Sequence, residues 1–232
     1  MATLSSTITG SGFHFTLSTT FGLDDSVDLV DQQLHIVYDL DPHVYADQYE
    51  LAQRPGYSTV LWGTTDLEKP VSAVDSDGSV LLLTADTSRL VSHPPANITF
   101  EVPLHARYGN PLAGVASDSA YHRIVLRRPL GFLAAKGDVR ACSKQIPVAR
   151  EVPEPLRPYA SLDGWPSSRL SLIRDTAADE PLNVVIPVGV LDDLTWVDLG
   201  TATVVITMFF YLLHASWKTA RRLSSKLSTK TD

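Results

Sequence analysis

The sequence has little of what most catalytic and metal sites need. It contains one cysteine, Cys142, which excludes an internal disulfide framework and any cysteine-based zinc finger. We expect this thiol to be inert rather than reactive. The glycine-rich nucleotide loops, zinc-protease motif and nucleophile elbow are absent, and the seven histidines show no ligand spacing. The sequence therefore predicts no catalytic set, no metal and no cofactor.

Basic residues are scarce in the first 195 positions. This region has 14 Lys and Arg against 24 Asp and Glu, whereas residues 196–232 have 5 against 2. The formal net charge of −7 is thus the sum of a negatively charged N-terminal region and a positively charged C-terminal segment. An acidic domain repels nucleic acid, so we expect no nucleic-acid partner.

Long apolar runs are absent except for one near the C-terminus. The 19 residues from Leu199 to Trp217 include no Asp, Glu, Lys or Arg. A helix of that length spans about 28 Å, close to the hydrocarbon thickness of a bilayer. Trp196 and Trp217 bracket it, as aromatic residues do at membrane interfaces. The sequence predicts a transmembrane helix over 196–217, followed by a basic tail over 218–232.

Two topologies remain open for residues 1–195. Five basic residues follow the apolar run, which by the positive-inside rule places the tail in the cytosol and the N-terminal domain in the lumen or outside. Residues 1–30, however, lack the usual secretory signal, and this favours a tail anchor with a cytosolic domain. The only glycosylation acceptor is Asn97-Ile98-Thr99, and a glycan on Asn97 would place the domain in the lumen.

The predicted membrane helix has one face of small and hydroxyl side chains. Gly200, Thr203, Thr207 and Tyr211, with His214, fall within an arc of about 80° on a helical wheel. Such a stripe is typical of membrane helices that pack on a partner helix, although threonines also scatter by chance. The basic tail fixes the orientation of the helix, or binds anionic lipid through Lys218, Arg221 and Arg222.

The rest of the chain has the pattern of a β protein. Short runs of alternating or β-branched residues are separated by clusters of Pro, Gly, Asp and Ser, which predicts an all-β, sandwich-like domain over 1–195. Prolines concentrate over about 147–166, where we expect an extended connector. The predicted strands are 13–17, 33–38, 59–62, 79–84, 98–108, 121–127 and 183–190.

The strand 98–108 carries the densest polar chemistry. Alternation places Glu101, His105 and Arg107 on one face, and Phe100, Leu104, Ala106 and Tyr108 on the other. Glu101 with His105 is a conceivable acid–base pair. The alternative, which we favour, is a solvated face whose cation pairs with a neighbouring carboxylate.

Three segments in order resemble the PIG-X/Pbn family. Pro103, His105, Arg107 and Tyr108, followed by Pro111, match a "P-x-H-x-R-Y" strand that precedes a proline. Upstream, residues 44–51 are similar to a "V-x-x-D-x-x-E-L" segment. Downstream, 187–201 is similar to a "P-V-G … T" approach to the membrane, so the resemblance covers roughly residues 40–215. The residues Gly109-Asn110 depart from the family pattern.

The resemblance implies a function that the residues alone do not. Members of this family are single-span glycoproteins of the endoplasmic reticulum membrane. They are non-catalytic accessory subunits that stabilise the multi-pass mannosyltransferase adding the first mannose of the glycosylphosphatidylinositol (GPI) anchor. The resemblance thus implies that the motif strand is structural or partner-facing, that the domain is lumenal, and that the stripe on the helix packs on the enzyme. A tail-anchored adaptor with a cytosolic β domain is the alternative.

Overall fold

The computed structural model describes residues 2–23, 32–64, 66–86, 96–135, 153–166, 170–173 and 180–228. Cys142 and residues 147–152 lie outside these ranges. The chain forms two compact units. The first, the β unit, comprises residues 1–110 and 121–188, and the second, the helix unit, comprises 111–120 and 189–232.

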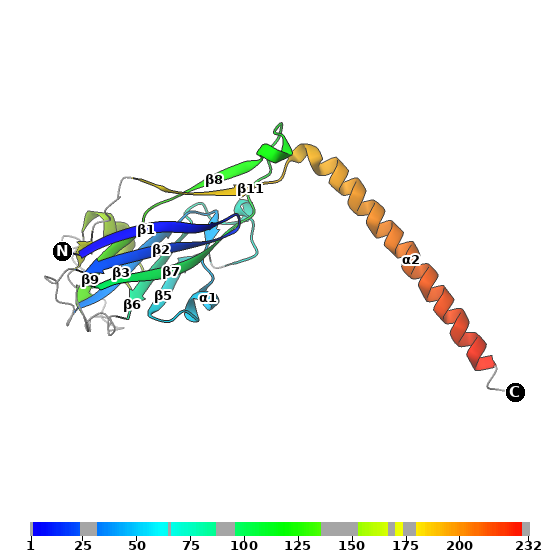
Figure 1. The fold of residues 1–232 in the computed structure, drawn as a ribbon, viewed down its shortest axis with the longest axis horizontal. Coiled ribbons are helices and arrows are strands. Elements are labelled where there is room, and N and C mark those ends of the chain that lie inside the picture. The colour runs from blue at the N-terminus through cyan, green and yellow to red at the C-terminus, as the bar shows by residue number, and fades with distance from the viewer. Residues whose placement is uncertain are drawn as a thin grey trace. The chain divides into compact units, whose positions relative to one another are not determined.

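The β unit is built from two antiparallel sheets and a two-stranded ribbon (Figure 1). In hydrogen-bonded order, the first sheet consists of β1 (Ala2–Ser11), β2 (His14–Leu23), β7 (Ala96–Ala106) and β4 (Val44–Tyr45). The second sheet, in the same order, consists of β10 (Ser171–Ile173), β9 (Leu130–Ala135), β3 (Gln32–Leu40), β6 (Ser79–Ala85) and β5 (Tyr57–Gly63). The ribbon pairs β11 (Leu182–Pro187) with β8 (Tyr121–Leu126). The prediction of an all-β domain with one apolar C-terminal helix is confirmed.

Each strand predicted from alternation overlaps an observed one, but β1, β4, β9 and β10 were not predicted. The longest of these is β1. Its sequence is mostly Ser and Thr, and only Leu4 and Ser6 are buried. A short helix, α1 (Gln48–Ala52), was also unexpected. The Asp47 side chain caps it by accepting a hydrogen bond from the Tyr49 amide at 2.8 Å, and Leu51 anchors it in the core. Five residues are too few for a helical period to be recognised in the sequence.

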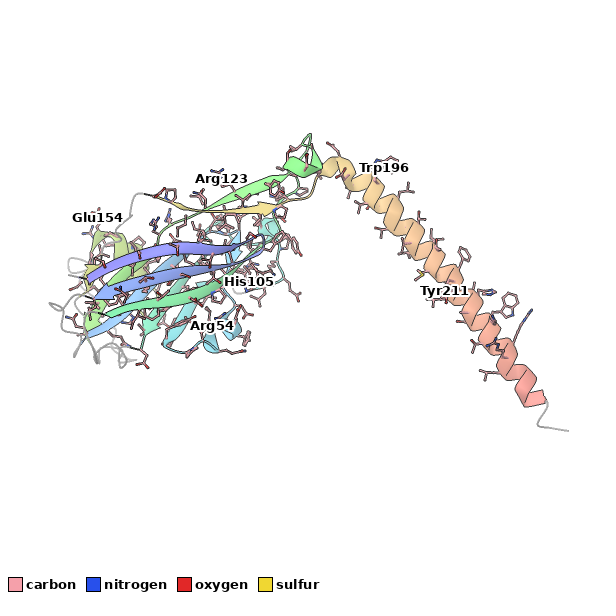
Figure 2. All side chains as sticks on the ribbon, in the orientation of Figure 1. Arg54, His105, Arg123, Glu154, Trp196 and Tyr211 are labelled. Atoms are coloured by element: carbon pink, nitrogen blue, oxygen red, sulfur yellow. The ribbon has the colours of Figure 1, made fainter. Side chains whose placement is uncertain are left out.

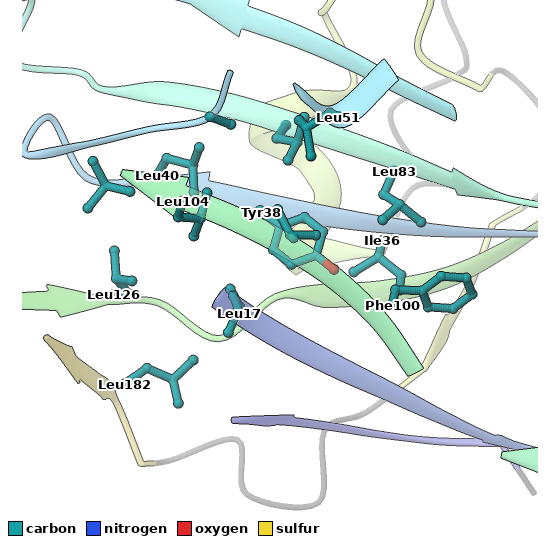
Figure 3. Close-up of a cluster of buried hydrophobic side chains, with 14 of the residues drawn as sticks. Leu17, Ile36, Tyr38, Leu40, Leu51, Leu83, Phe100, Leu104, Leu126 and Leu182 are labelled. Atoms are coloured by element: carbon teal, nitrogen blue, oxygen red, sulfur yellow. The ribbon is translucent and has the colours of Figure 1, made fainter. Parts of the chain in front are cut away.

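The main core lies between the two sheets (Figure 3). The inward residues of β2 and β7, such as Leu17 and Leu104, face those of β3 and β6, such as Ile36 and Leu83. One face of the β8/β11 ribbon joins the same cluster through Leu126 and Leu182 among others. The period of two in the sequence therefore buries one face of each strand.

Three hydroxyl groups form a hydrogen-bonded chain within this core. Tyr38 of β3 is 1% exposed, and its hydroxyl donates to Thr19 Oγ1 of β2 at 3.2 Å. Ser6 Oγ of β1 donates to the same Thr19 oxygen at 3.3 Å. Burial raises the pKa of the Tyr38 phenol, so this group stays a neutral donor. Thr19 thus accepts two hydrogen bonds from residues that are themselves buried.

A second apolar cluster covers the outer face of the five-stranded sheet. Val37, Leu82 and Phe132 of the sheet pack with Leu156 and Trp165 from the proline-rich segment. That segment is not extended throughout, because a 3₁₀ helix runs over Glu154–Tyr159. The fixed φ of proline is compatible with a 3₁₀ turn, and the buried Leu156 and Trp165 give the segment a reason to fold onto the sheet.

The helix unit joins a loop to the start of α2 (Leu194–Ser228). Leu112 donates its amide to the Gly189 carbonyl at 2.9 Å and accepts from the Leu191 amide at 2.8 Å. The Gly114 amide donates to Asp192 Oδ2 at 3.0 Å. Residues 191–223 are long and apolar enough to cross a membrane, with a mean hydropathy of 1.6 in the best window. The predicted boundaries at 195 and 217 remain predictions.

The shared acceptor Thr19 gives a test of the core. Thr19→Val keeps the shape but leaves two buried hydroxyls without an acceptor, so it should lower the free energy of unfolding by about 2 kcal/mol. Tyr38→Phe leaves Ser6 paired with Thr19 and should cost about 1 kcal/mol or less. Denaturant unfolding of the detergent-solubilised chain measures both. A larger cost for Tyr38→Phe than for Thr19→Val would contradict this account.

Candidate functional site

The polar residues of the motif strand gather at the end of β7. His105 pairs in register with His14 of β2 on one side and with Tyr45 of β4 on the other. Its ring stacks on Tyr45 with centroids 5.2 Å apart and meets the His14 ring edge-on at 4.8 Å. The sheet register therefore lines up three rings on the outer face of the first sheet (Figure 2, where His105 is labelled).

His105 is held by hydrogen bonds at both ring nitrogens. Nε2 lies 2.9 Å from Glu50 Oε2 of α1, and Nδ1 lies 2.8 Å from His14 Nδ1. One of the two facing Nδ1 atoms must carry the proton that they share. The less favoured alternative, an acid–base pair of Glu101 with His105, is not formed, because the carboxylate that reaches His105 is Glu50 of α1. Glu101 Oε2 instead lies 4.0 Å from Arg54 Nη1.

Arg107 is buried rather than solvated. Arg107 follows the last residue of β7, Ala106, and is only 4% exposed because the loop at Asp66 and Lys69 covers its guanidinium. Its Nη1 donates to the carbonyls of Asp66 at 2.6 Å and Lys69 at 2.9 Å, and its guanidinium lies 4.8 Å from the Tyr45 ring centroid. The expectation of a solvated face with a carboxylate partner therefore fails for Arg107. Burial lowers its pKa, with the nearby Tyr45 and Asp66 opposing.

The two prolines and the tyrosine of the motif lie in different environments. Pro103 is buried within β7. The backbone N–H of Arg107 donates to the His43 carbonyl at 2.7 Å, on the side of the strand away from β2. The backbone N–H groups of the odd-numbered residues of β7 therefore also face away from β2. Pro103 shares this side, where its missing N–H costs the sheet no bond to β2. Tyr108 is 74% exposed, and its ring packs on Phe13 at 5.0 Å. Pro111 belongs to the helix unit.

A second pair of histidines is formed by His43, two residues before Tyr45, and His122 of β8. His43 stacks on His122 of β8 with ring centroids 4.5 Å apart. His43 Nδ1 lies 2.7 Å from Asp41 Oδ1. The pKa of His122 is lowered first by burial and then by His43, while Asp41 opposes the shift. His122 thus stacks on a His43 ring that is itself bonded to the Asp41 carboxylate, which is a structural contact.

A pocket of about 340 Å³ opens between β5 and β7. The Tyr57 hydroxyl donates to the Glu101 carbonyl across it at 2.8 Å, and burial raises the pKa of this phenol to about 12. Arg54 and Asp86 line its rim. In the described ranges, no three His, Cys, Asp or Glu side chains converge as ligands of a metal ion.

Asn97 is exposed on the outer face of the first sheet. It lies opposite Gly22 of β2, and a Cβ on Gly22 would come within 3.1 Å of Asn97 Oδ1. The glycine thus leaves room for the carboxamide. Thr99, the hydroxyl residue of the acceptor triplet, lies 2.9 Å from Thr20 Oγ1 through its own Oγ1. An exposed Asn on an outer face is accessible to a glycan.

The two threonines of the stripe on α2 bond to carbonyls of their own helix. Thr203 donates to the Leu199 carbonyl and Thr207 to the Thr203 carbonyl, both at 2.7 Å. A Cβ on Gly200 would meet no atom within 4 Å. The threonine hydroxyls are therefore already hydrogen-bonded, and what this face gives a partner helix is room for close backbone contact. At the other end of the helix, the Arg221 guanidinium lies 4.8 Å from the Trp217 ring centroid.

Removal of the Arg107 side chain should loosen the loop that it binds. Arg107→Ala leaves two loop carbonyls without their donor and opens a cavity, so we expect unfolding to become easier by about 2–4 kcal/mol. Arg127→Ala, which removes an exposed pair with Asp39, should cost less than about 1 kcal/mol. Thermal unfolding and proteolysis at residues 66–69 measure these effects. Equal losses in the two variants would show that Arg107 is not a structural residue.

Comparison with known proteins matches this chain to one family. The family profile described as PIG-X / PBN1 covers residues 10–217, from β1 into α2. Protein PBN1 of Debaryomyces hansenii is 31% identical over 111 residues, which are 47% of this chain but 22% of that protein. The alignment thus spans about a fifth of the relative.

Among solved structures, the major pilin subunit BcpA of Bacillus cereus matches with a TM-score of 0.35 and 9% identity, over 80% of this chain and 40% of that one. A likeness this weak carries no argument about fold or function. The family profile, by contrast, runs through the motif strand, the ribbon and most of the apolar helix. The chain therefore belongs to the PIG-X / PBN1 family, which is associated with GPI-anchor biosynthesis.

Proposed function

We propose that this protein is a non-catalytic accessory subunit that stabilises the mannosyltransferase of the endoplasmic reticulum adding the first mannose of the GPI anchor. The match of the family profile over residues 10–217 carries this proposal. The described residues support it, because the polar cluster at the end of β7 is occupied by internal contacts. His105 is tied to Glu50 and His14, and Arg107 to two backbone carbonyls.

In this function the two units have separate tasks. The β unit faces the lumen, and Pro103, His105 and Arg107 keep the end of β7 and its neighbouring loop in shape. The helix α2 crosses the membrane with its basic end in the cytosol. Its stripe of Gly200, Thr203, Thr207 and Tyr211 packs against the helices of the multi-pass enzyme, because small side chains let two helix backbones approach closely.

The topology is tested by glycosylation of Asn97. A lumenal β unit predicts a mobility shift that an endoglycosidase removes and that is lost in Asn97→Gln and in Thr99→Ala. Thr20→Ala is the matched control, since it removes the same Thr20–Thr99 contact but keeps the acceptor triplet. Protease treatment of sealed microsomes gives a second measurement. If protease digests the β unit and no shift occurs, the protein is a tail-anchored adaptor with a cytosolic domain.

The partnership is tested by co-purification and by the level of the enzyme. We expect the multi-pass mannosyltransferase to co-purify with the full chain, and deletion of the chain to lower the enzyme level and GPI assembly. Gly200→Leu with Thr207→Leu should reduce recovery of the enzyme about fivefold or more, because bulk on the stripe separates the helices. Val205→Leu, on the opposite face, should leave recovery unchanged. Equal recovery with all variants would remove the stripe from the interface.

A further inference from the structure

The β8/β11 ribbon has an exposed face that the core does not use. In the antiparallel register, Ile124 pairs with Val184 and Leu126 with Leu182, and these side chains are buried. The other face displays the alternate residues of both strands, and all of them are exposed. These are Tyr121 opposite Pro187, Arg123 opposite Val185, and Val125 opposite Asn183.

The composition of this face differs from that of the β unit as a whole. Residues 1–195 are strongly acidic, with 24 Asp and Glu, yet the six residues of the exposed face include no carboxylate. Arg123 is their only charge (Figure 2). Tyr121 is 56% exposed and Val185 is 47% exposed. An aromatic ring, an aliphatic side chain and one cation together have the amphipathic character of a membrane–water interface.

A second exposed tyrosine lies at the same end of the β unit. A Cβ on Gly109 would come within 3.1 Å of Val188 Cγ1, so the backbone after Tyr108 runs beside the residue that follows Pro187. Tyr108 is 74% exposed. We call Tyr108, Tyr121, Arg123, Val185 and Pro187 the tyrosine patch. It combines Tyr108, the last residue of the family motif, with the half of the exposed ribbon face that includes Pro187, where β11 ends.

The length of the connecting chain keeps this patch near the bilayer at any angle between the two units. β11 ends at Pro187, Val190 is extended, and a 3₁₀ turn over Leu191–Asp193 leads directly into α2 at Leu194. Three extended steps and four 3₁₀ steps reach at most about 19 Å. If Leu199 begins the hydrocarbon span, Leu194 lies at the headgroup layer, because five helical residues rise about 7.5 Å.

We propose that the tyrosine patch contacts the lipid headgroup layer and holds the β unit against the membrane. Arg123 binds headgroup phosphate, because a guanidinium forms bidentate hydrogen bonds with phosphate oxygens. The rings of Tyr108 and Tyr121 lie among the headgroups with their hydroxyls toward water. This inference requires that α2 crosses the bilayer, but it does not depend on the enzyme that the chain serves.

Lipid quenching of a fluorescent label tests the contact. The full chain carrying Cys142→Ser receives a single cysteine by Val185→Cys, is labelled with an environment-sensitive dye, and is reconstituted in phosphatidylcholine vesicles with headgroup-nitroxide lipid. Val60→Cys on β5 is the matched control, since Val60 is 45% exposed and also lies on a strand. We expect quenching at position 185 to exceed that at position 60 about threefold or more, because nitroxides quench only nearby dyes at the interface.

A second site and a charge variant keep the test decisive. Tyr121→Cys replaces Val185→Cys if the latter lowers the thermal unfolding midpoint. Arg123→Gln should reduce quenching at position 185, and more so when anionic phospholipid is present. Equal quenching at positions 185 and 60 would overturn the proposal. So would a label at 185 that lipid does not quench but that a co-reconstituted protein shields, which would make the face a protein-docking surface.

Discussion

Burial of the facing sides of two antiparallel sheets is the constraint on which the rest of the β unit depends. It fixes which residues of β2, β3, β6 and β7 point inward, and the ribbon β8/β11 adds its apolar face to the same core. The hydrogen bond from Tyr38 of β3 to Thr19 of β2 joins the two sheets and restricts how one can slide over the other, since a shift would leave a buried hydroxyl unpaired. A packed core of this kind specifies one register rather than several.

The register of β7 with its neighbouring strands in turn determines the environment of each residue of the family motif. Pro103 falls on the side of the strand where a missing N–H breaks no bond to β2. His105 falls on the outer face between His14 and Tyr45. One residue beyond the end of the strand, Arg107 lies over the Tyr45 ring and is buried by the loop whose carbonyls it binds at Asp66 and Lys69. Four neighbouring positions thus have four different environments, and only Tyr108 is left largely exposed.

The sequence pattern predicted most strands and the apolar helix. These features depend on local periodicity, such as the alternation in β3 and the uncharged run in α2. It did not predict the Glu50–His105 contact or the burial of Arg107, because their partners lie 55 and about 40 residues away in the chain. β1 was missed because Ser and Thr dominate it, and its pairing with β2 rather than hydrophobicity defines it. The family resemblance located the motif but could not show which of its residues are buried.

The loop of residues 111–120 ties the apolar helix α2 to the β unit at more than one point of the chain. This loop is bonded to the entry of α2 through Leu112 and Gly114, so the chain passes between the two units three times. A cut after Val188 would remove Gly189, Leu191 and Asp192, and it would leave the loop without its hydrogen-bonding partners. The helix α2 is therefore not a modular appendage that can be removed without disturbing the rest of the fold. A water-soluble form would require the loop to be redesigned together with the cut, which makes shedding by a single proteolytic event structurally costly.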